Sequence, residues 1–169
     1  MTDKAKKAGN IMTHLIRKPN PTELPALAQL WYDGWQVAHA AHVPASLTAI
    51  RTLDSFAIRL SDHLENIRVI GEIDRPLGFC ITKGPEIYQL YVCPAAKGTG
   101  AAASLIMDGV SRIRLAGHKS AKLDVNAENA RAIAFYEKMG WQRKGVETIM
   151  LDTLAEPYPL PCLVMTQKL

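Results

Sequence analysis

Hydrophobic and polar residues follow two different periods along this chain. A helical spacing of three to four residues in the N-terminal part changes to a strand-like alternation from residue 67. Apolar residues recur every three or four positions from Thr22, the expected N-cap, to about residue 38. This is the spacing of an amphipathic helix, and Pro25 fits its first turn. The pattern then breaks, and a second helical segment passes through residues 56–60. We therefore predict that the chain opens with a helical hairpin.

From residue 67 onward the apolar residues alternate with polar ones, which is typical of strands. This alternation predicts three short strands, at residues 67–73, 77–82 and 86–92. The connections at residues 74–76 and 83–85 both contain proline, which favours turns. Three strands joined so closely form an antiparallel meander.

The second half of the chain returns to mixed periods. The predicted elements are a helix from about residue 102 that ends near Gly117, a strand at 121–125, a helix at 128–139 that stops at Gly140, and strands at 143–151 and 160–168. We expect the proline-rich run at residues 157–161 to be a stiff loop whose Tyr158 could reach substrate or a second subunit. The order ααβββαβαββ predicts an α+β fold with a mixed, mostly antiparallel sheet and helices on both faces.

Length and composition indicate a single folded domain. The chain has 169 residues, of which 48% are hydrophobic and 21% charged. We expect residues 12–169 to form the domain and residues 1–11, which carry three lysines, to be a flexible extension. No stretch has the apolar length of a signal peptide or a membrane span, so the expected location is the cytoplasm.

Cysteine content and charge narrow the function classes. Cys80, Cys93 and Cys162 are odd in number and far apart, without zinc or redox spacing, so neither a disulfide framework nor a metal site is expected. The net charge of +4 suits an anionic cofactor or simple solubility. Nucleic acid is not expected as a partner, because no recognition helix or basic stripe accompanies the charge. The sequence leaves open whether the protein forms a homodimer.

The most informative segment joins a strand to a helix through glycines. The strand at 86–92 is broken by Pro94, and a short loop then opens the next helix. The first backbone N–H groups of a helix lack internal partners and carry partial positive charge, so they attract phosphate oxygens. The candidate anion-binding residues are Lys97, Gly98, Thr99, Gly100, Ala101 and Ala102. Taken alone, this run is also compatible with an ordinary glycine-containing helix start.

A second motif lies about thirty residues further on and makes the pattern specific. The chain resembles the GCN5-related N-acetyltransferase (GNAT) family, whose signature N-x-x-A-x-x-F-Y-x-x-x-G-aromatic is matched by Asn129, Ala132, Phe135, Tyr136, Gly140 and Trp141. The loop that begins at Lys97 is similar to the family's coenzyme loop [RQ]-x-x-G-x-[GA], except at its first position. Lysine still meets phosphate as a point charge, but it lacks the planar fork of arginine. The resemblance covers residues 64–145 well and the remainder only by element order.

The resemblance implies acetyl-CoA as the cofactor, bound in a V between two splayed parallel strands at the centre of the sheet. The pyrophosphate would lie on the glycine loop, and the pantetheine would pair with the backbone of Leu90, Tyr91 and Val92. The N–H of Tyr91 would polarise the thioester carbonyl. Asn126 and Asn129 would cap the following helix and hold the second strand beside the coenzyme.

The resemblance also assigns proton transfers. Tyr136 matches the family tyrosine that protonates the leaving thiolate, although an aromatic at that position can equally be a core residue. Glu86, at the start of the strand before the loop, is the candidate base that deprotonates the amine; it can equally be an exposed strand-end charge. His39 and His42 are alternative bases, and with Trp35 they are expected to line the substrate pocket.

These residues favour an N-acetyltransferase that passes acetyl directly from acetyl-CoA to a primary amine of a small molecule, amino-acid derivative or peptide, through a ternary complex. A covalent route through Cys93 is less favoured, because no motif supplies its base. Asp124 is expected to be a surface or supporting group. The alternative function is a non-catalytic acyl-CoA-binding or sensing domain.

Overall fold

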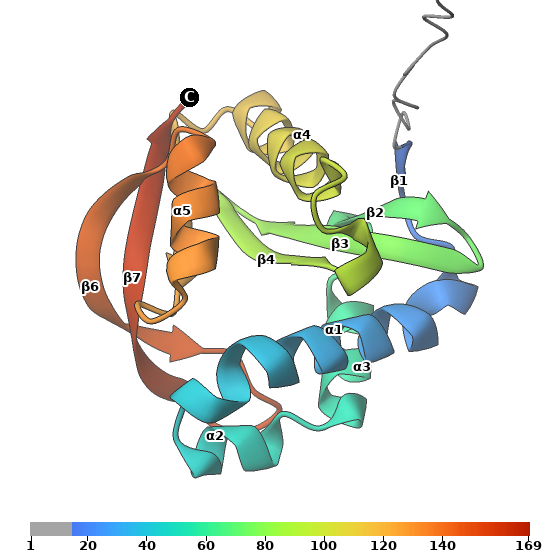
Figure 1. Cartoon of the computed structure of the whole chain (residues 1–169), viewed down its shortest axis with the longest axis horizontal. Helices are drawn as coiled ribbons and strands as arrows, with labels where there is room; N and C mark the ends of the chain where they lie inside the picture. Colours follow the sequence, from blue (N-terminus) through green and yellow to red (C-terminus); the bar gives the residue numbers. More distant parts are fainter. Residues whose placement is uncertain (1–14) are drawn as a thin grey trace, which may run out of the picture.

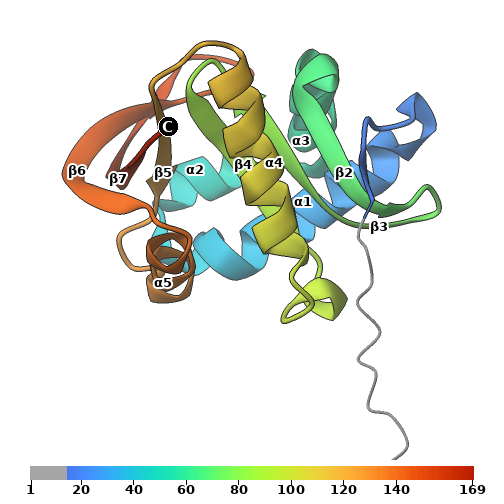
Figure 2. The ribbon, with the colours of Figure 1, turned by 90° about the horizontal axis from the view of Figure 1, so that it is seen from above.

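The computed structural model describes residues 15–169, and the extension predicted at residues 1–11 lies outside that range. Within residues 15–169 the chain forms a seven-stranded sheet in the order β1-β2-β3-β4-β5-β7-β6, with helices on both faces (Figures 1 and 2). The strands are β1 (Ile16–Arg17), β2 (Ile67–Glu72), β3 (Arg75–Lys83), β4 (Glu86–Val92), β5 (Ser120–Val125), β6 (Gln142–Leu151) and β7 (Tyr158–Lys168). The helices are α1 (Leu24–His39), α2 (Ala45–Ile50), α3 (Leu53–Asp62), α4 (Ala101–Leu115) and α5 (Ala130–Lys138). The predicted α+β class and mostly antiparallel sheet are confirmed.

The N-terminal helices differ from the predicted hairpin in two respects. The N-cap of the first turn is Asn20 rather than Thr22, and it forms a capping box with Glu23 before α1 begins. A short third helix, α2, lies between the two predicted ones; with six residues it is too short to show a helical period.

The meander β2-β3-β4 is confirmed, with an irregularity that matters for the site. Ile81 pairs with Gln89 and Thr82 with Ile87, so Tyr88 is an extra residue in β4. Such a bulge breaks the alternation of side chains. As a result Tyr88 and Tyr91 both pack on the α1 side of the sheet, while Leu90 packs on the α4 side.

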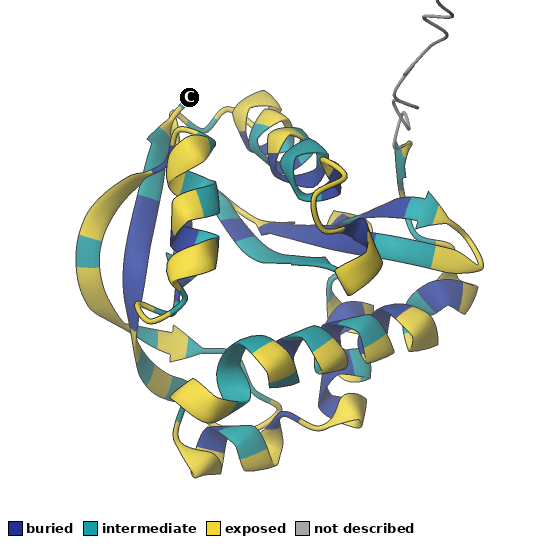
Figure 3. Cartoon of the chain, viewed as in Figure 1, coloured by how far each residue is buried: buried dark blue, intermediate teal, exposed yellow. Residues whose placement is uncertain are grey.

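Two hydrophobic clusters hold the helices on opposite faces of the sheet (Figure 3). On one face, Trp31 of α1 packs against Phe56 of α3, with ring centroids 4.7 Å apart. Gly34 allows α1 to approach the sheet closely, because a Cβ there would lie 2.7 Å from the ring of Tyr91. The other cluster lies under α4 and α5.

The parallel pair β4 and β5 separates almost at once, as predicted. The two strands share one pairing, between Glu86 and Lys122, next to a hydrogen bond from the Lys122 N–H to the Pro85 carbonyl. Beyond it, β5 pairs only with β7. The rest of β4 therefore turns an unpaired edge toward the space between the strands (Figure 1).

The expectation of a stiff loop at residues 157–161 is wrong, because Tyr158 to Pro161 belong to β7. They pair with β6, from Leu151↔Tyr158 to Thr148↔Pro161. The prolines are tolerated because β5 pairs with β7 only from Leu163 onward, so this part of β7 has a neighbouring strand on one side only.

Candidate functional site

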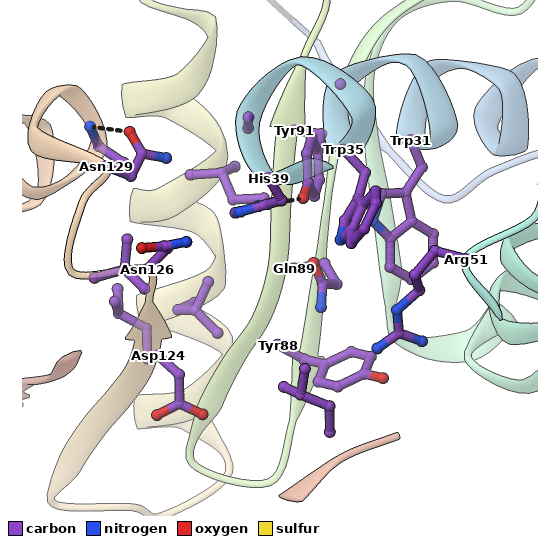
Figure 4. A pocket seen from close by; sticks show the side chains of 18 of the residues that line it. Trp31, Trp35, His39, Arg51, Tyr88, Gln89, Tyr91, Asp124, Asn126 and Asn129 are labelled. Carbon is purple, nitrogen blue, oxygen red and sulfur yellow. Dashed lines mark hydrogen bonds between the residues drawn. The ribbon is translucent and has the colours of Figure 1, made fainter. Parts of the chain in front are cut away.

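A cleft of about 950 Å³ opens where β4 and β5 separate. Residues of α1, β4, β5, α5, β6 and β7 line it. Many of the residues predicted for the site lie in this lining: Trp35, His39, Glu86, Leu90, Tyr91, Val92, Lys97, Asn126, Asn129 and Tyr136. Side chains from distant parts of the chain therefore face one space (Figure 4).

The glycine loop lies at one border of the cleft, between a short turn (Pro94–Ala96) and α4. Gly98 and Gly100 have φ angles of 77° and 86°, a left-handed conformation that favours glycine. A Cβ at either position would meet nothing within 4 Å, so the space in front of the α4 N-terminus is open. The hydroxyl of Thr99 donates to the Ala96 carbonyl at 2.6 Å and closes the turn. Lys97 reaches the cleft lining, whereas residues 98–102 do not.

The two asparagines shape the end of β5 and the start of α5. The side-chain oxygen of Asn126 accepts from the Glu128 N–H at 2.9 Å, and that of Asn129 accepts from the Ala132 N–H at 3.2 Å. Asn129 is therefore the N-cap of α5 and stabilises the start of this helix beside the cleft.

Tyr136 lies on α5 with its ring against Phe135 and Trp141. Burial raises the pKa of its phenol well above the ordinary value, so the hydroxyl keeps its proton at neutral pH. A neutral phenol that lines the cleft can donate a proton.

Glu86 lies at the point where β4 and β5 part, and Asp124 is its neighbour on β5. Burial, and next the charge of Asp124, raise the pKa of Glu86 to about 7. Burial also raises the pKa of Asp124. The ammonium of Lys122 lies 3.8 Å from Glu86, too far for a strong hydrogen bond. Glu86 can therefore exchange a proton near neutral pH.

Of the two roles expected for Asp124, a surface group or a supporting group, the structure contradicts only the first. Asp124 is half-buried and lines the cleft, and its Oδ1 atom is buried without a hydrogen-bond partner among the described residues. Ala121, Leu123 and Val125 pack into the core, and the alternate residues of β5 point the other way. The same alternation, available in the sequence, could have placed Asp124 beside Asn126.

The two histidines have separate environments. The Nε2 atom of His39 lies 3.1 Å from the hydroxyl of Tyr91, and burial lowers the pKa of His39 to about 4, so it is neutral at pH 7. His42 is exposed and does not line the cleft; its Nδ1 atom lies 2.9 Å from a carboxylate oxygen of Glu128. The pocket residue Trp35 packs its ring against that of His39.

Sequence reasoning missed several polar residues of the cleft, among them Arg51, Arg59 and Tyr88. Arg51 follows α2, Arg59 lies on α3 and Tyr88 is the bulged residue of β4. Arginines near short helices ordinarily face solvent, and no motif marks these two.

Comparison with known proteins agrees with this geometry. The family model described as an acetyltransferase (GNAT) domain matches residues 46–155. Peptidyl-lysine N-acetyltransferase YjaB of Escherichia coli is 30% identical over 91 residues, which are 54% of this chain and 57% of that protein. An uncharacterized N-acetyltransferase of Mycobacterium tuberculosis is 32% identical over 117 residues, which are 66% of this chain and 72% of that protein. The chain thus spans little more than half of the first of these relatives.

Solved structures with the same fold cover nearly the whole chain. A GCN5-related N-acetyltransferase of Rhodopseudomonas palustris has a TM-score of 0.72 at 24% identity, over 93% of this chain and 96% of that one. PaiA N-acetyltransferase of Thermoplasma acidophilum, solved with coenzyme A, has a TM-score of 0.63 at 17% identity, over 94% of this chain and 100% of that one. None of the helices in residues 15–169 has the length and apolar character needed to cross a bilayer. The match to well over half of the chain, together with the splayed strands and the glycine loop, shows that the chain belongs to the GNAT acetyltransferase domain family.

Proposed function

We propose that this protein is an acetyl-CoA-dependent N-acetyltransferase that transfers acetyl directly to a primary amine within a ternary complex. The main support for this proposal is the position of Glu86. Its pKa is raised to about 7, and it lies where the splayed strands meet, in the same cleft as Lys97. A proton acceptor and an anion-attracting loop are thus turned toward one space. Bound acetyl-CoA would supply the acetyl group as a reactive thioester.

The residues present fit the coenzyme. The open space in front of Gly98 and Gly100 leaves room for pyrophosphate oxygens at the N-terminus of α4, and Lys97 adds a positive charge. The unpaired edge of β4 at Leu90, Tyr91 and Val92 offers backbone groups to the amides of a pantetheine arm, as an edge strand does to an added strand. Relatives that carry the name N-acetyltransferase, and the coenzyme A complex of a structural neighbour, support this assignment.

Glu86 is the proposed base. A primary ammonium must lose its proton before its nitrogen can attack, and a carboxyl that titrates near pH 7 can take that proton directly or through a water. His39 is less suited, since a pKa of about 4 makes it a weak base. Cys93 lines the cleft as a free thiol without a hydrogen-bonded base among the described residues, so direct transfer is preferred to a covalent route.

Tyr136 is the proposed proton donor to the leaving thiolate. The Tyr136→Phe variant should lower kcat on the order of 100-fold, the usual scale for losing a general acid, and leave the Kd for acetyl-CoA within about twofold. Tyr158→Phe is the matched control, because that hydroxyl contacts Ser46 at 2.7 Å and lies outside the cleft lining. Steady-state release of free CoA thiol measures kcat. An unchanged kcat in Tyr136→Phe would remove the acid role.

The first test of the function is thermal unfolding of the protein with acetyl-CoA, with AMP as control. A ligand at about 100 times its Kd adds about 2.7 kcal/mol to stability, which raises Tm by about 5–10 °C for a chain of this size. We expect that rise with acetyl-CoA and not with AMP, followed by thiol release when amines are added. No rise at saturating acetyl-CoA would contradict the coenzyme site. A rise without turnover on any amine would favour the acyl-CoA-binding or sensing domain instead.

A further inference from the structure

Two buried arginines lie on the side of the cleft formed by α2, α3 and β4. Arg51 is 4% exposed and Arg59 is 6% exposed. Nη1 of Arg51 donates to the backbone carbonyl of Asp152 at 2.7 Å, and Nη2 of Arg59 donates to the hydroxyl of Tyr88 at 2.7 Å. The guanidinium carbon of Arg59 also lies 4.5 Å from the ring centroid of Trp31. Both side chains are thus held in place by neutral groups.

Neither arginine has a carboxylate partner. Within residues 15–169 no salt bridge involves Arg51 or Arg59, and the Nε atom of each is buried without a hydrogen-bond partner. The nearby carboxylate of Asp152 forms an ion pair with Lys83, whose ammonium lies 2.7 Å from Oδ2. Two cations therefore share a buried corner without a counter-ion of their own.

Such an arrangement is costly in a protein interior. Burial, and next the positive charge of Arg59, lower the pKa of Arg51 to about 10. Buried charges in proteins are ordinarily paired, so a buried guanidinium without a counter-ion is a candidate for binding a group of opposite charge. Arginine presents a planar fork of N–H donors that matches a carboxylate or a phosphate.

The arginine corner faces the carboxyls of Glu86, the proposed base, and of Asp124 across the cleft. Figure 4 shows Arg51, Tyr88 and Gln89 on one side of the space and Asp124 and Asn126 on the other. Glu86 lies beside Asp124 at the strand vertex. One end of the cleft thus carries the two arginines, with the Lys83–Asp152 ion pair beside them. The other end carries the carboxyls of Glu86 and Asp124, with the ammonium of Lys122 3.8 Å from Glu86.

We propose that the acceptor is an amino acid or a similar zwitterion, whose anionic group binds the guanidinium of Arg51 while its amine faces Glu86 and Asp124. This inference rests on the proposed acetyltransferase function and narrows its acceptor. A carboxylate or a phosphate would satisfy the same guanidinium, and matched probes separate the two.

The test compares amines that differ only in the anion. Phenylalanine is paired with phenethylamine, lysine with cadaverine, and phosphoethanolamine with ethanolamine. Binding to the protein saturated with CoA is measured by titration calorimetry, and acetyl transfer by thiol release. We expect at least one anionic member to bind more tightly than its partner by about 10- to 100-fold, the scale of a charge-assisted hydrogen bond. Preference for the amino acids indicates a carboxylate, and preference for phosphoethanolamine a phosphate.

Arg51→Met should abolish this preference, because it weakens binding of the anionic probe and leaves binding of its partner without the anion unchanged. Arg75→Met is the control, since Arg75 is exposed and does not line the cleft. Equal binding of the members of every pair by the unmodified protein would overturn the proposal, whether or not the variant folds. So would a preference that survives in folded Arg51→Met. If anionic probes bind in an Arg51-dependent way and no amine is acetylated, the anion site stands and the proposed function fails.

Discussion

The Gly100→Glu variant is expected to lose affinity for acetyl-CoA by on the order of 100-fold or more. Gly100 has a φ of 86° and ends the loop in front of α4, with open space around the position of a Cβ. A glutamate there places a negative charge at the helix N-terminus, where the pyrophosphate oxygens would lie. It replaces a favourable charge interaction by a repulsive one, and the side chain fills part of the space.

The strain that any side chain adds at a positive φ has to be separated from that effect. Gly117, at the other end of α4, has a φ of 93° and equally open surroundings. The Gly117→Glu variant therefore carries a similar backbone strain, about 1 kcal/mol, and the same charge away from the cleft. Titration calorimetry should show near-normal acetyl-CoA affinity for Gly117→Glu and none measurable for Gly100→Glu. Equal affinities in the two variants would mean that the loop does not bind the pyrophosphate.

The Glu86→Gln variant is expected to lower kcat/KM on the order of 10³-fold at pH 7.5, because glutamine cannot accept the proton of the amine. In the unmodified protein the rate should rise with pH and level off above about pH 7, as the Glu86 carboxyl ionises. That rise should vanish in the variant. Glu72→Gln, at an exposed position at the end of β2, should leave the profile unchanged.

The position of the rise also discriminates between the candidate bases. A profile governed by His39 would rise near pH 4, where its pKa lies. If Glu86→Gln keeps the rise near pH 7, Glu86 is not the base, and the other carboxyl of the pair, Asp124, becomes the first alternative.

The pH dependence of the free energy of unfolding reports on the pKa of Glu86 without any measurement of turnover. Its folded-state pKa of about 7 lies above the ordinary value of 4.5, so the folded protein holds this proton more tightly than the unfolded chain does. The carboxyl then favours folding below about pH 4.5, and this contribution is lost as pH rises through about 7. The Glu86→Gln variant should therefore gain stability relative to the unmodified protein across that window, as measured by chemical denaturation.

Much of the architecture could be predicted because local sequence determines it. The strand at Glu86–Val92, the glycine turn and the capped helix from Asn129 each depend on residues close together in the chain. The proline-containing start of β7 could not be predicted in this way. Whether Pro159 is tolerated depends on which strand lies beside it, and that is a property of the whole sheet.

The acceptor side of the site depends on tertiary contacts that no local pattern reports. Strict alternation would put Tyr88 and Leu90 on the same face, and the bulge in β4 separates them. Arg51 is fixed by the Asp152 carbonyl, 101 positions away. Its burial and missing counter-ion become visible only once the chain is folded.

The single pairing between Glu86 and Lys122 has a mechanical consequence. It is the only place where the two halves of the sheet in residues 15–169 are joined strand to strand, so it is the natural pivot for any rotation of one half against the other. Points far from a pivot move most, and points on it hardly move. Opening or narrowing of the cleft would displace the loop at Lys97 and the rim at Asn126, while the carboxyl of Glu86 keeps its place. A rotation about this pairing would change the width of the binding space while the proton acceptor proposed at Glu86 keeps its position.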